Sequence, residues 1–109
     1  MSALKRAEET LDALGNPVRR EIINILLLGP RSVGSIAAEL PVSRPAVSRH
    51  LRILEKAALV HHNAKGNSNL FTLNPTGFEA AQEWLNAFWE EGLKRFAALA
   101  EESNRTENE

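Results

Sequence analysis

Residues 43–58 carry the side chains best suited to recognise another molecule. When this segment is drawn as a helix with about 100° per residue, its side chains separate into two faces. One face is apolar apart from a histidine, and its members are Ala46, Val47, His50, Leu51, Ile53 and Leu54. The other face is polar and rich in hydrogen-bond donors, and its members are Ser48, Arg49, Arg52, Glu55 and Lys56. Guanidinium groups pair with the edge of guanine and an α-helix fits the DNA major groove, so the polar face has the chemistry of a DNA-reading helix.

Within this segment we predict two kinds of DNA contact. Arg44, Ser48, Arg49 and Arg52 are the candidates for base contacts, and the free N–H groups at the start of the helix suit a phosphate oxygen. His50 lies at the edge of the apolar face, which favours a hydrogen-bonded structural histidine and leaves a phosphate contact as the alternative. The predicted DNA-binding set is Ser43, Arg44, Ser48, Arg49, His50, Arg52 and Lys56. The alternative is an ordinary solvated helix face.

The preceding elements place this helix. Apolar residues at helical spacing predict a helix over residues 2–14, and Asn16-Pro17 is a typical cap and first position for a second helix over residues 17–28. Gly29-Pro30 ends that helix, and Ser32 caps a short third helix over residues 33–40. A tight turn at residues 41–42 then leads into the DNA-reading segment. Two helices joined by such a turn form a helix-turn-helix.

The pattern after the reading segment predicts a β-hairpin. Residues 59–62 and 70–73 are short strand-like runs, and a polar loop over residues 63–69 separates them. We expect this loop to be longer than a two-residue turn and to protrude. Its residues Lys65, Asn67 and Ser68 would follow a phosphate strand or enter the minor groove, and a plain exposed turn is the alternative.

The predicted fold class is mainly α with a small β-hairpin wing, in the order of four helices, two strands and a long last helix over residues 75–101. This order is typical of a winged helix-turn-helix. We expect one domain over residues 1–102, with its first and last helices as dimerisation elements, and a polar, disordered tail over residues 103–109.

The charge distribution supports a nucleic-acid partner although the net charge is −1. Residues 17–66 carry eight basic and three acidic side chains, whereas residues 67–109 carry three basic and eight acidic ones. The middle of the chain can therefore present a positive face to DNA, and ordinary solvated charge is the alternative.

Several classes of protein are disfavoured. The chain has no cysteine, which excludes a disulfide framework and a thiolate metal site. It begins without a signal-peptide pattern and has no apolar run of membrane-spanning length, so we expect a cytoplasmic protein without a membrane partner. Ser48 and His50 do not face each other on a helix and no glycine-rich phosphate loop occurs, so we expect no enzymatic activity and no cofactor.

Two segments resemble the ArsR-type family of transcriptional repressors. Residues 14–23, with Asn16-Pro17-Val18-Arg19, resemble that family's opening motif, and residues 43–54, with Ser48-Arg49-His50-Leu51, resemble its recognition helix. Gly66 with residues 70–73 resembles its wing. The resemblance covers about residues 11–99 and implies a winged-helix homodimer that binds a palindromic operator and represses transcription.

In this family the first and last helices form the dimer interface, and the last helix here has more apolar surface than one small core can use. The expected interface residues are Leu4, Leu11, Trp84, Leu85, Phe88, Trp89 and Phe96. The alternative is that the last helix folds back over its own domain.

The metal-sensing property of the family is not expected in this chain. The cysteines of its thiolate sensors are missing, and residues 75–101 contain neither Asp nor His. The remaining candidates, His61 and His62, are neighbours on a strand and point to opposite faces. Residues 83–93 instead resemble a metal-independent, cysteine-free subgroup of these regulators.

The sequence therefore predicts a sequence-specific DNA-binding transcriptional regulator, a repressor acting as a homodimer. The alternative is a winged-helix protein-interaction module without DNA binding, in which the outer face of residues 43–58 would be apolar or mixed. Repression requires only that a promoter be occupied, so the direction of regulation rests on the resemblance. A site for an effector would lie where the first and last helices meet.

Overall fold

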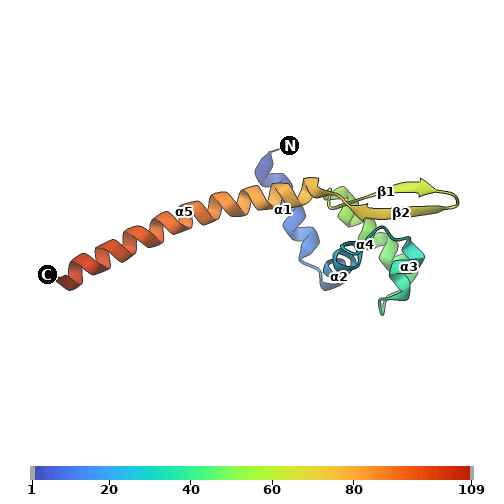
Figure 1. The fold of residues 1–109 in the computed structure, drawn as a ribbon, viewed down its shortest axis with the longest axis horizontal. Helices are drawn as coiled ribbons and strands as arrows, with labels where there is room; N and C mark the ends of the chain where they lie inside the picture. The colour runs from blue at the N-terminus through green and yellow to red at the C-terminus, as the bar shows by residue number, and fades with distance from the viewer. Residues whose placement is uncertain (1, 109) are drawn as a thin grey trace.

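The computed structural model describes residues 2–108, which form five helices and one antiparallel hairpin (Figure 1). The elements are α1 (Ala3–Leu14), α2 (Pro17–Leu26), α3 (Val33–Ala38), α4 (Arg44–Lys56), β1 (Val60–Lys65), β2 (Ser68–Leu73) and α5 (Pro75–Asn108). This order and the two-stranded wing confirm the predicted fold class.

α2, α3 and α4 begin where the sequence predicts and α1 begins one residue later, because each of the four has a side-chain cap. In each case the cap's side-chain oxygen accepts a hydrogen bond from the N–H three residues further on. The four caps are Ser2, Asn16, Ser32 and Ser43. Since capping is a local interaction, the sequence alone is enough to place these starts.

Two helices end earlier than predicted. α2 ends at Leu26 rather than near residue 28, and α3 ends at Ala38 rather than near residue 40. Beyond each end the chain closes tighter turns, in which Gly29 N–H donates to the Leu26 carbonyl and Leu40 N–H to the Ala37 carbonyl. In these turns an N–H donates to the carbonyl three residues earlier. Carbonyls at the end of each helix are thereby satisfied, but the chain leaves the α-helical path.

The predicted long loop in the hairpin is wrong. β1 and β2 pair from Val60 with Leu73 to Lys65 with Ser68, so only Gly66 and Asn67 form the turn. Gly66 has a φ of +62°, the backbone region that tight hairpin turns require at this position. The polar residues pair because a strand ladder is built from backbone groups, and the hairpin still projects from the helices (Figure 1).

The core lies between α2, α3, α4 and the base of the hairpin. We call this part of the molecule, residues 17–73, the head. Its buried apolar side chains include Ile22, Leu26, Ile36, Val47, Leu51, Leu54, Leu59 and Val60. Arg31 forms an isolated β-bridge with Phe71 and thereby ties the loop after α2 to the wing.

α1 and α5 pack on each other beside this core, to which α1 contributes Ala13 at its C-terminal end. The fully buried Thr10 hydroxyl donates to the Gly77 carbonyl at 3.0 Å, and the buried Ala7 and Ala81 contribute to the α1 and α5 packing surfaces. Beyond Ala81 nearly all described side chains of α5 are exposed. The helix leaves the body of the molecule along this part of its length (Figure 1).

α5 continues to Asn108, past the predicted end near residue 101. Residues 101–108 contain no glycine or proline, so the sequence offers no strong stop signal. Glu109 lies outside the described residues. The division into a domain of residues 1–102 and a tail of residues 103–109 stays a prediction.

Candidate nucleic-acid interface

α4 is held by one face and leaves the opposite face to solvent. Val47, Leu51 and Leu54 are at most 1% exposed and fix the helix against the core. Arg49, Arg52 and Lys56 lie on the opposite face and are all exposed. Within the described part of the chain none of these three forms an ion pair, so their donors are free to meet a ligand.

Ile53 departs from the predicted pattern. The helical wheel places it on the packing face, but 44% of its surface is exposed. It lines a shallow hollow together with Arg49, Arg52 and Lys56. The outer face of α4 is thus basic with one apolar contact point.

The start of α4 has two of its side chains engaged locally. The Ser43 Oγ accepts a hydrogen bond from the Ala46 N–H at 3.3 Å, which leaves its own hydroxyl proton free. Arg44 is exposed, and its guanidinium lies close to Gly34 of α3, 3.5 Å from where a Cβ on that glycine would be. Ser48 is half-buried.

His50 is a hydrogen-bonded residue with one ring nitrogen engaged. Its Nδ1 lies 3.4 Å from Arg19 Nη1. Because a guanidinium has donors only, Nδ1 has to accept, and the proton of the neutral ring is then on Nε2. Burial lowers the pKa of His50 below its ordinary value of 6.5, and the positive charges of Arg19 and Arg49 lower it further. His50 is therefore a neutral donor at physiological pH.

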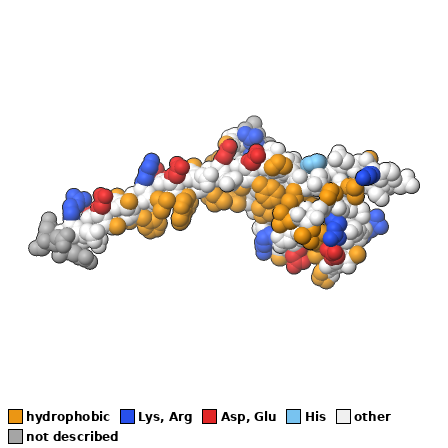
Figure 2. All heavy atoms as spheres, viewed as in Figure 1, with side chains coloured by type: hydrophobic (Ala, Val, Ile, Leu, Met, Phe, Trp, Pro, Cys, Tyr) orange, Lys and Arg blue, Asp and Glu red, His pale blue; other side chains and the backbone are white. Residues whose placement is uncertain are grey.

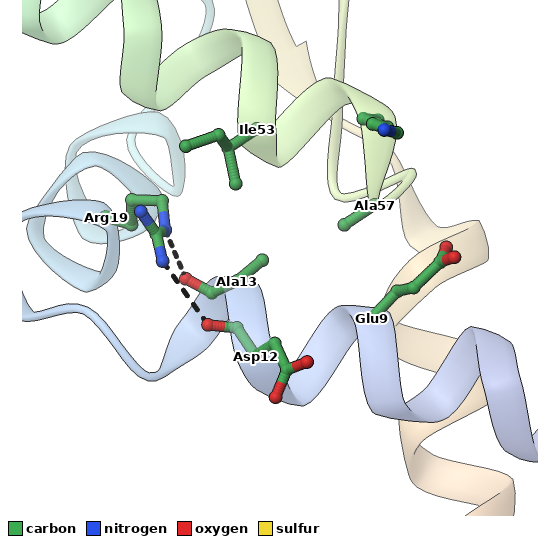
Figure 3. A pocket seen from close by; sticks show the side chains of 7 residues that line it. Glu9, Asp12, Ala13, Arg19, Ile53 and Ala57 are labelled. Atoms are coloured by element: carbon green, nitrogen blue, oxygen red, sulfur yellow. Dashed lines mark hydrogen bonds between the residues drawn. The ribbon is translucent and has the colours of Figure 1, made fainter.

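Arg19 links this histidine to the end of α1. Its Nε donates to the Ala13 carbonyl at 2.6 Å and its Nη2 to the Asp12 carbonyl at 3.3 Å, as the dashed lines in Figure 3 show. Together with Ile53 of α4, Arg19 lines a pocket between α1, α2 and α4 (Figure 3). One guanidinium thus joins two carbonyls of α1 to the recognition helix.

The sequence interpretation did not assign Arg19 this role. A usable signal was present, because Arg19 precedes Ile22, Ile23 and Leu26 by three, four and seven residues. At helical spacing this places an arginine on the apolar face of α2, where it requires partners.

The wing places its three predicted residues together at the tip. Lys65 and Ser68 are register partners, Asn67 lies in the turn between them, and all three are exposed. At the base of the wing, His62 Nδ1 and Glu55 Oε2 are 2.6 Å apart, which joins β1 to α4. The tip of the hairpin is therefore far from α4, whereas the base of the hairpin is joined to α4.

The predicted dimer residues lie apart from this surface, on α1 and α5. Leu4 and Leu11 of α1 are 52% and 37% exposed. On α5, Trp84 is half-buried and stacks on Phe88 with ring centroids 5.6 Å apart. The other three are exposed, namely Leu85, Trp89 and Phe96. Figure 2 shows apolar side chains along one side of α5.

Among residues 2–108, no group of three or more His, Cys, Asp or Glu side chains is arranged to hold a metal ion. No described helix combines the length and apolar character needed to cross a membrane.

The helix-turn-helix, its basic outer face and the hairpin define a winged helix-turn-helix DNA-binding protein. Residues 16–62 match the family model described as bacterial regulatory proteins of the ArsR family. The HTH-type transcriptional regulator Rv2034 of Mycobacterium tuberculosis is 40% identical over 99 residues, which are 91% of this chain and 92% of that protein. The chain therefore belongs to the ArsR family, a family of transcriptional regulators and not of enzymes.

Two further relatives carry names that state a direction of regulation. The transcriptional repressor SdpR of Bacillus subtilis is 32% identical over 73% of this chain and 89% of its own length. The transcriptional activator HlyU of Vibrio cholerae is 31% identical over 77% of this chain and 78% of its own length.

Solved structures share the fold. An ArsR-like transcriptional regulator from Rhodococcus sp. RHA1 superposes with a TM-score of 0.79 at 27% identity, over 88% of this chain and 91% of that one. The homodimeric winged helix-turn-helix domain of Mb0332 from Mycobacterium bovis superposes with a TM-score of 0.64 at 23% identity, over 84% and 85%.

Proposed function

We propose that this regulator binds a palindromic operator as a homodimer and represses transcription by occupying the promoter. The observation that carries the proposal is the outer face of α4, where Arg49, Arg52 and Lys56 are exposed on a helix whose other face is buried. A surface with three free cations on a fixed helix matches the donor requirements of the major groove.

Each residue has a role in this proposal. Base edges are read by Arg44, Ser48, Arg49 and Arg52. Phosphate oxygens are bound by Lys56, by Ser43 with the N-terminus of α4, and by the Nε2 proton of His50. The wing residues Lys65, Asn67 and Ser68 bind the backbone beside the recognition site or enter the minor groove.

The homodimer supplies the second half of the recognition. Mb0332 is described as homodimeric, and in our proposal the corresponding contacts here come from Leu4, Leu11, Trp84, Leu85, Phe88, Trp89 and Phe96. Two recognition helices would then lie roughly 34–36 Å apart, one turn of DNA. In this proposal neither a metal nor a cofactor takes part, and the protein acts on DNA in the cytoplasm.

SdpR supports repression as the direction of regulation, and HlyU is the counterexample among the relatives. We favour repression because repression requires only that the promoter be covered, which a protein of this size can do. A reporter gene behind the protein's own promoter should therefore be expressed more strongly when the protein is absent. Lower expression in its absence would make it an activator.

Binding to the DNA upstream of its own gene tests the proposed recognition. Arg52→Ala should weaken binding by about 1–3 kcal/mol, or about 5- to 150-fold, because it removes a bidentate base contact. The matched control is Arg95→Ala, which removes the same charge from exposed α5 and should leave affinity unchanged.

The salt dependence of binding gives a second readout. If each protomer neutralises three or four phosphates, log K against log salt should have a slope of roughly −5 to −7. A wild-type protein that shows no shifted band below micromolar concentration would overturn the proposal. Equal affinities of the Arg52→Ala and Arg95→Ala variants would remove Arg52 from the base-reading set.

A further inference from the structure

The free part of α5 carries an apolar stripe that is symmetric about one residue. We define this apolar stripe as Leu85, Phe88, Gly92, Phe96 and Leu99. Its four side chains are 48%, 61%, 69% and 61% exposed in chain order. The two phenylalanines lie four residues on either side of Gly92, and the two leucines lie seven residues on either side. At 3.6 residues per turn all five positions share one face of the helix.

Nothing among the described residues explains a glycine at the centre of this stripe. Gly92 lies in the interior of α5, where glycine costs about 1 kcal/mol relative to alanine. A Cβ built on Gly92 meets no atom within 4 Å, and its φ is not in the positive range. Neither a crowded contact within the chain nor a special backbone conformation therefore requires glycine. A glycine on a helix face does, however, allow a second backbone to approach closely.

The symmetric spacing matches the geometry of a two-fold axis. In an antiparallel pair of identical helices, a residue that lies n positions after the centre of one helix faces the residue that lies n positions before the centre of the other. A centre at Gly92 pairs Phe88 with Phe96 and Leu85 with Leu99, so apolar groups meet apolar groups along the whole stripe.

The features that limit the apolar stripe on its two sides lie equally far from Gly92. On the N-terminal side α1 packs on α5 near Ala81, which is 7% exposed. On the C-terminal side the sequence turns polar from Glu101 to Ser103. Ala81 and Ser103 both lie eleven residues from Gly92. A partner helix in this register would therefore reach α1 with the end of its apolar face.

We infer that two copies of this chain cross at Gly92, with their α5 helices antiparallel and Phe88 of each copy against Phe96 of the other. The inference rests on the proposed homodimer and adds its centre and register. Phe88, Phe96 and the neighbouring Trp89, which is 60% exposed, supply much of the contact. Since a whole aromatic side chain has about 150–250 Å² to bury and these three are 60–69% exposed, they supply about half of the roughly 800 Å² per partner that is typical of a stable interface.

Single cysteines test the crossing point, because the chain contains no cysteine of its own. In the inferred dimer a Gly92→Cys thiol lies next to its own symmetry mate, so mild oxidation should give a covalent dimer. The matched control is Leu85→Cys on the same stripe. Its symmetry mate is offset by about 21 Å along the helices, beyond the reach of roughly 7 Å between Cα atoms for a disulfide.

A mixture of two variants tests the register. Phe88→Cys and Phe96→Cys, oxidised together, should yield a heterodimeric disulfide in preference to either homodimer. Cross-linking of Leu85→Cys to itself as fast as Gly92→Cys would overturn the inference. So would an absence of cross-linked Gly92→Cys when that variant elutes as a dimer. A wild-type protein that sediments as a monomer at 100 micromolar or so would overturn the proposed homodimer itself.

A larger side chain at Gly92 provides an independent test. Gly92→Leu adds a side chain at the crossing and should raise the dimer dissociation constant about tenfold or more, whereas Ala97→Leu adds bulk on the opposite, exposed face and should not. Circular dichroism should show the helix retained in both variants, because leucine is a much better helix former than glycine and close to alanine. Equal dissociation constants for the two variants would contradict the inferred crossing.

Discussion

At the scale of single residues, Arg19 makes the widest set of contacts near the DNA-reading face. Its guanidinium reaches Asp12 and Ala13 at the end of α1 and His50 on α4. The sequence predicts that His50 is a hydrogen-bonded structural residue, and the structure supplies the partner. That partner lies 31 residues away, and only the packing of α2 against α4 brings the two together, so helical spacing alone does not identify it.

Removal of the Arg19 guanidinium should change the titration of His50. In Arg19→Met the pKa of His50 should rise toward 6.5, because one of the positive charges that lowers it is gone. The change is measured by NMR of the imidazole as a function of pH. Loss of the Arg19 donor should also allow the proton to move from Nε2 to Nδ1, which the ring nitrogen shifts report.

Arg20→Met is the matched control for this measurement. Arg20 is adjacent, carries the same charge and donates to the Leu14 carbonyl at 2.9 Å, but it makes no contact with His50. Its variant should leave the titration of His50 much closer to that of the wild type. If both variants moved the pKa equally, the effect would be one of overall charge and not of the contact.

The outer face of α4 shows what a residue pattern can predict. The exposure of Arg49, Arg52 and Lys56 follows from the helical wheel, since the buried face is clearly apolar. Ile53 was placed wrongly because the wheel counts an isoleucine as a packing residue. Ile53 lies at the boundary between the two faces. Whether it is covered depends on the distance between α1 and α4, which the sequence of α4 alone does not determine.

At the scale of elements, helix starts are predictable and strand ends are not. Each of the first four helices begins at a side-chain cap only a few atoms from the N–H that it satisfies. The hairpin extends through polar residues to Lys65 and Ser68 because its pairing uses backbone groups, which every sequence offers. The two-residue turn at Gly66 then follows from the pairing register.

The attachment of α1 to α5 depends on a buried hydroxyl. Thr10→Val keeps the shape of the side chain but removes the donor to the Gly77 carbonyl, and should cost about 1 kcal/mol of unfolding free energy. For a domain of this size that corresponds to a fall of roughly 4–8 °C in Tm, which thermal denaturation monitored by circular dichroism measures.

Thr76→Val is the control for this substitution. Thr76 is exposed in the first turn of α5, and its hydroxyl forms no hydrogen bond within the described residues. Its variant should stay within about 0.5 kcal/mol of the wild type. A Thr10→Val protein as stable as the control would show that the hydroxyl contributes nothing to the attachment.

At the scale of the whole molecule, the shape is a compact head with a long helix projecting from it. The extents are 73 × 31 × 20 Å, and the longest reflects α5 (Figure 1). The sequence predicts an apolar face on this helix but not how much of it is left uncovered. That depends on the length of α1, which covers α5 only near its N-terminal end.

The stability of the whole molecule should depend on its concentration. If α5 is covered by a second copy, the dimer is favoured at higher concentration and Tm should rise as the protein is brought from about 1 to about 100 micromolar. Phe96→Asp, which places a charge in the apolar stripe, should weaken this dependence. A Tm that stays constant over this range, with the protein monomeric throughout, would contradict a dimer formed through α5.

The packing of α1 on α5 also has a consequence for the order in which the protein folds on the ribosome. Most of the core of the head, residues 17–73, comes from the head itself and Ala13 of α1 completes it, so this part can fold before α5 is synthesised. α1 is made before the head, but its main packing partner is made after it. A nascent chain can therefore complete its DNA-reading surface with the end of α1 already held by Arg19, while the rest of α1 docks only when α5 emerges.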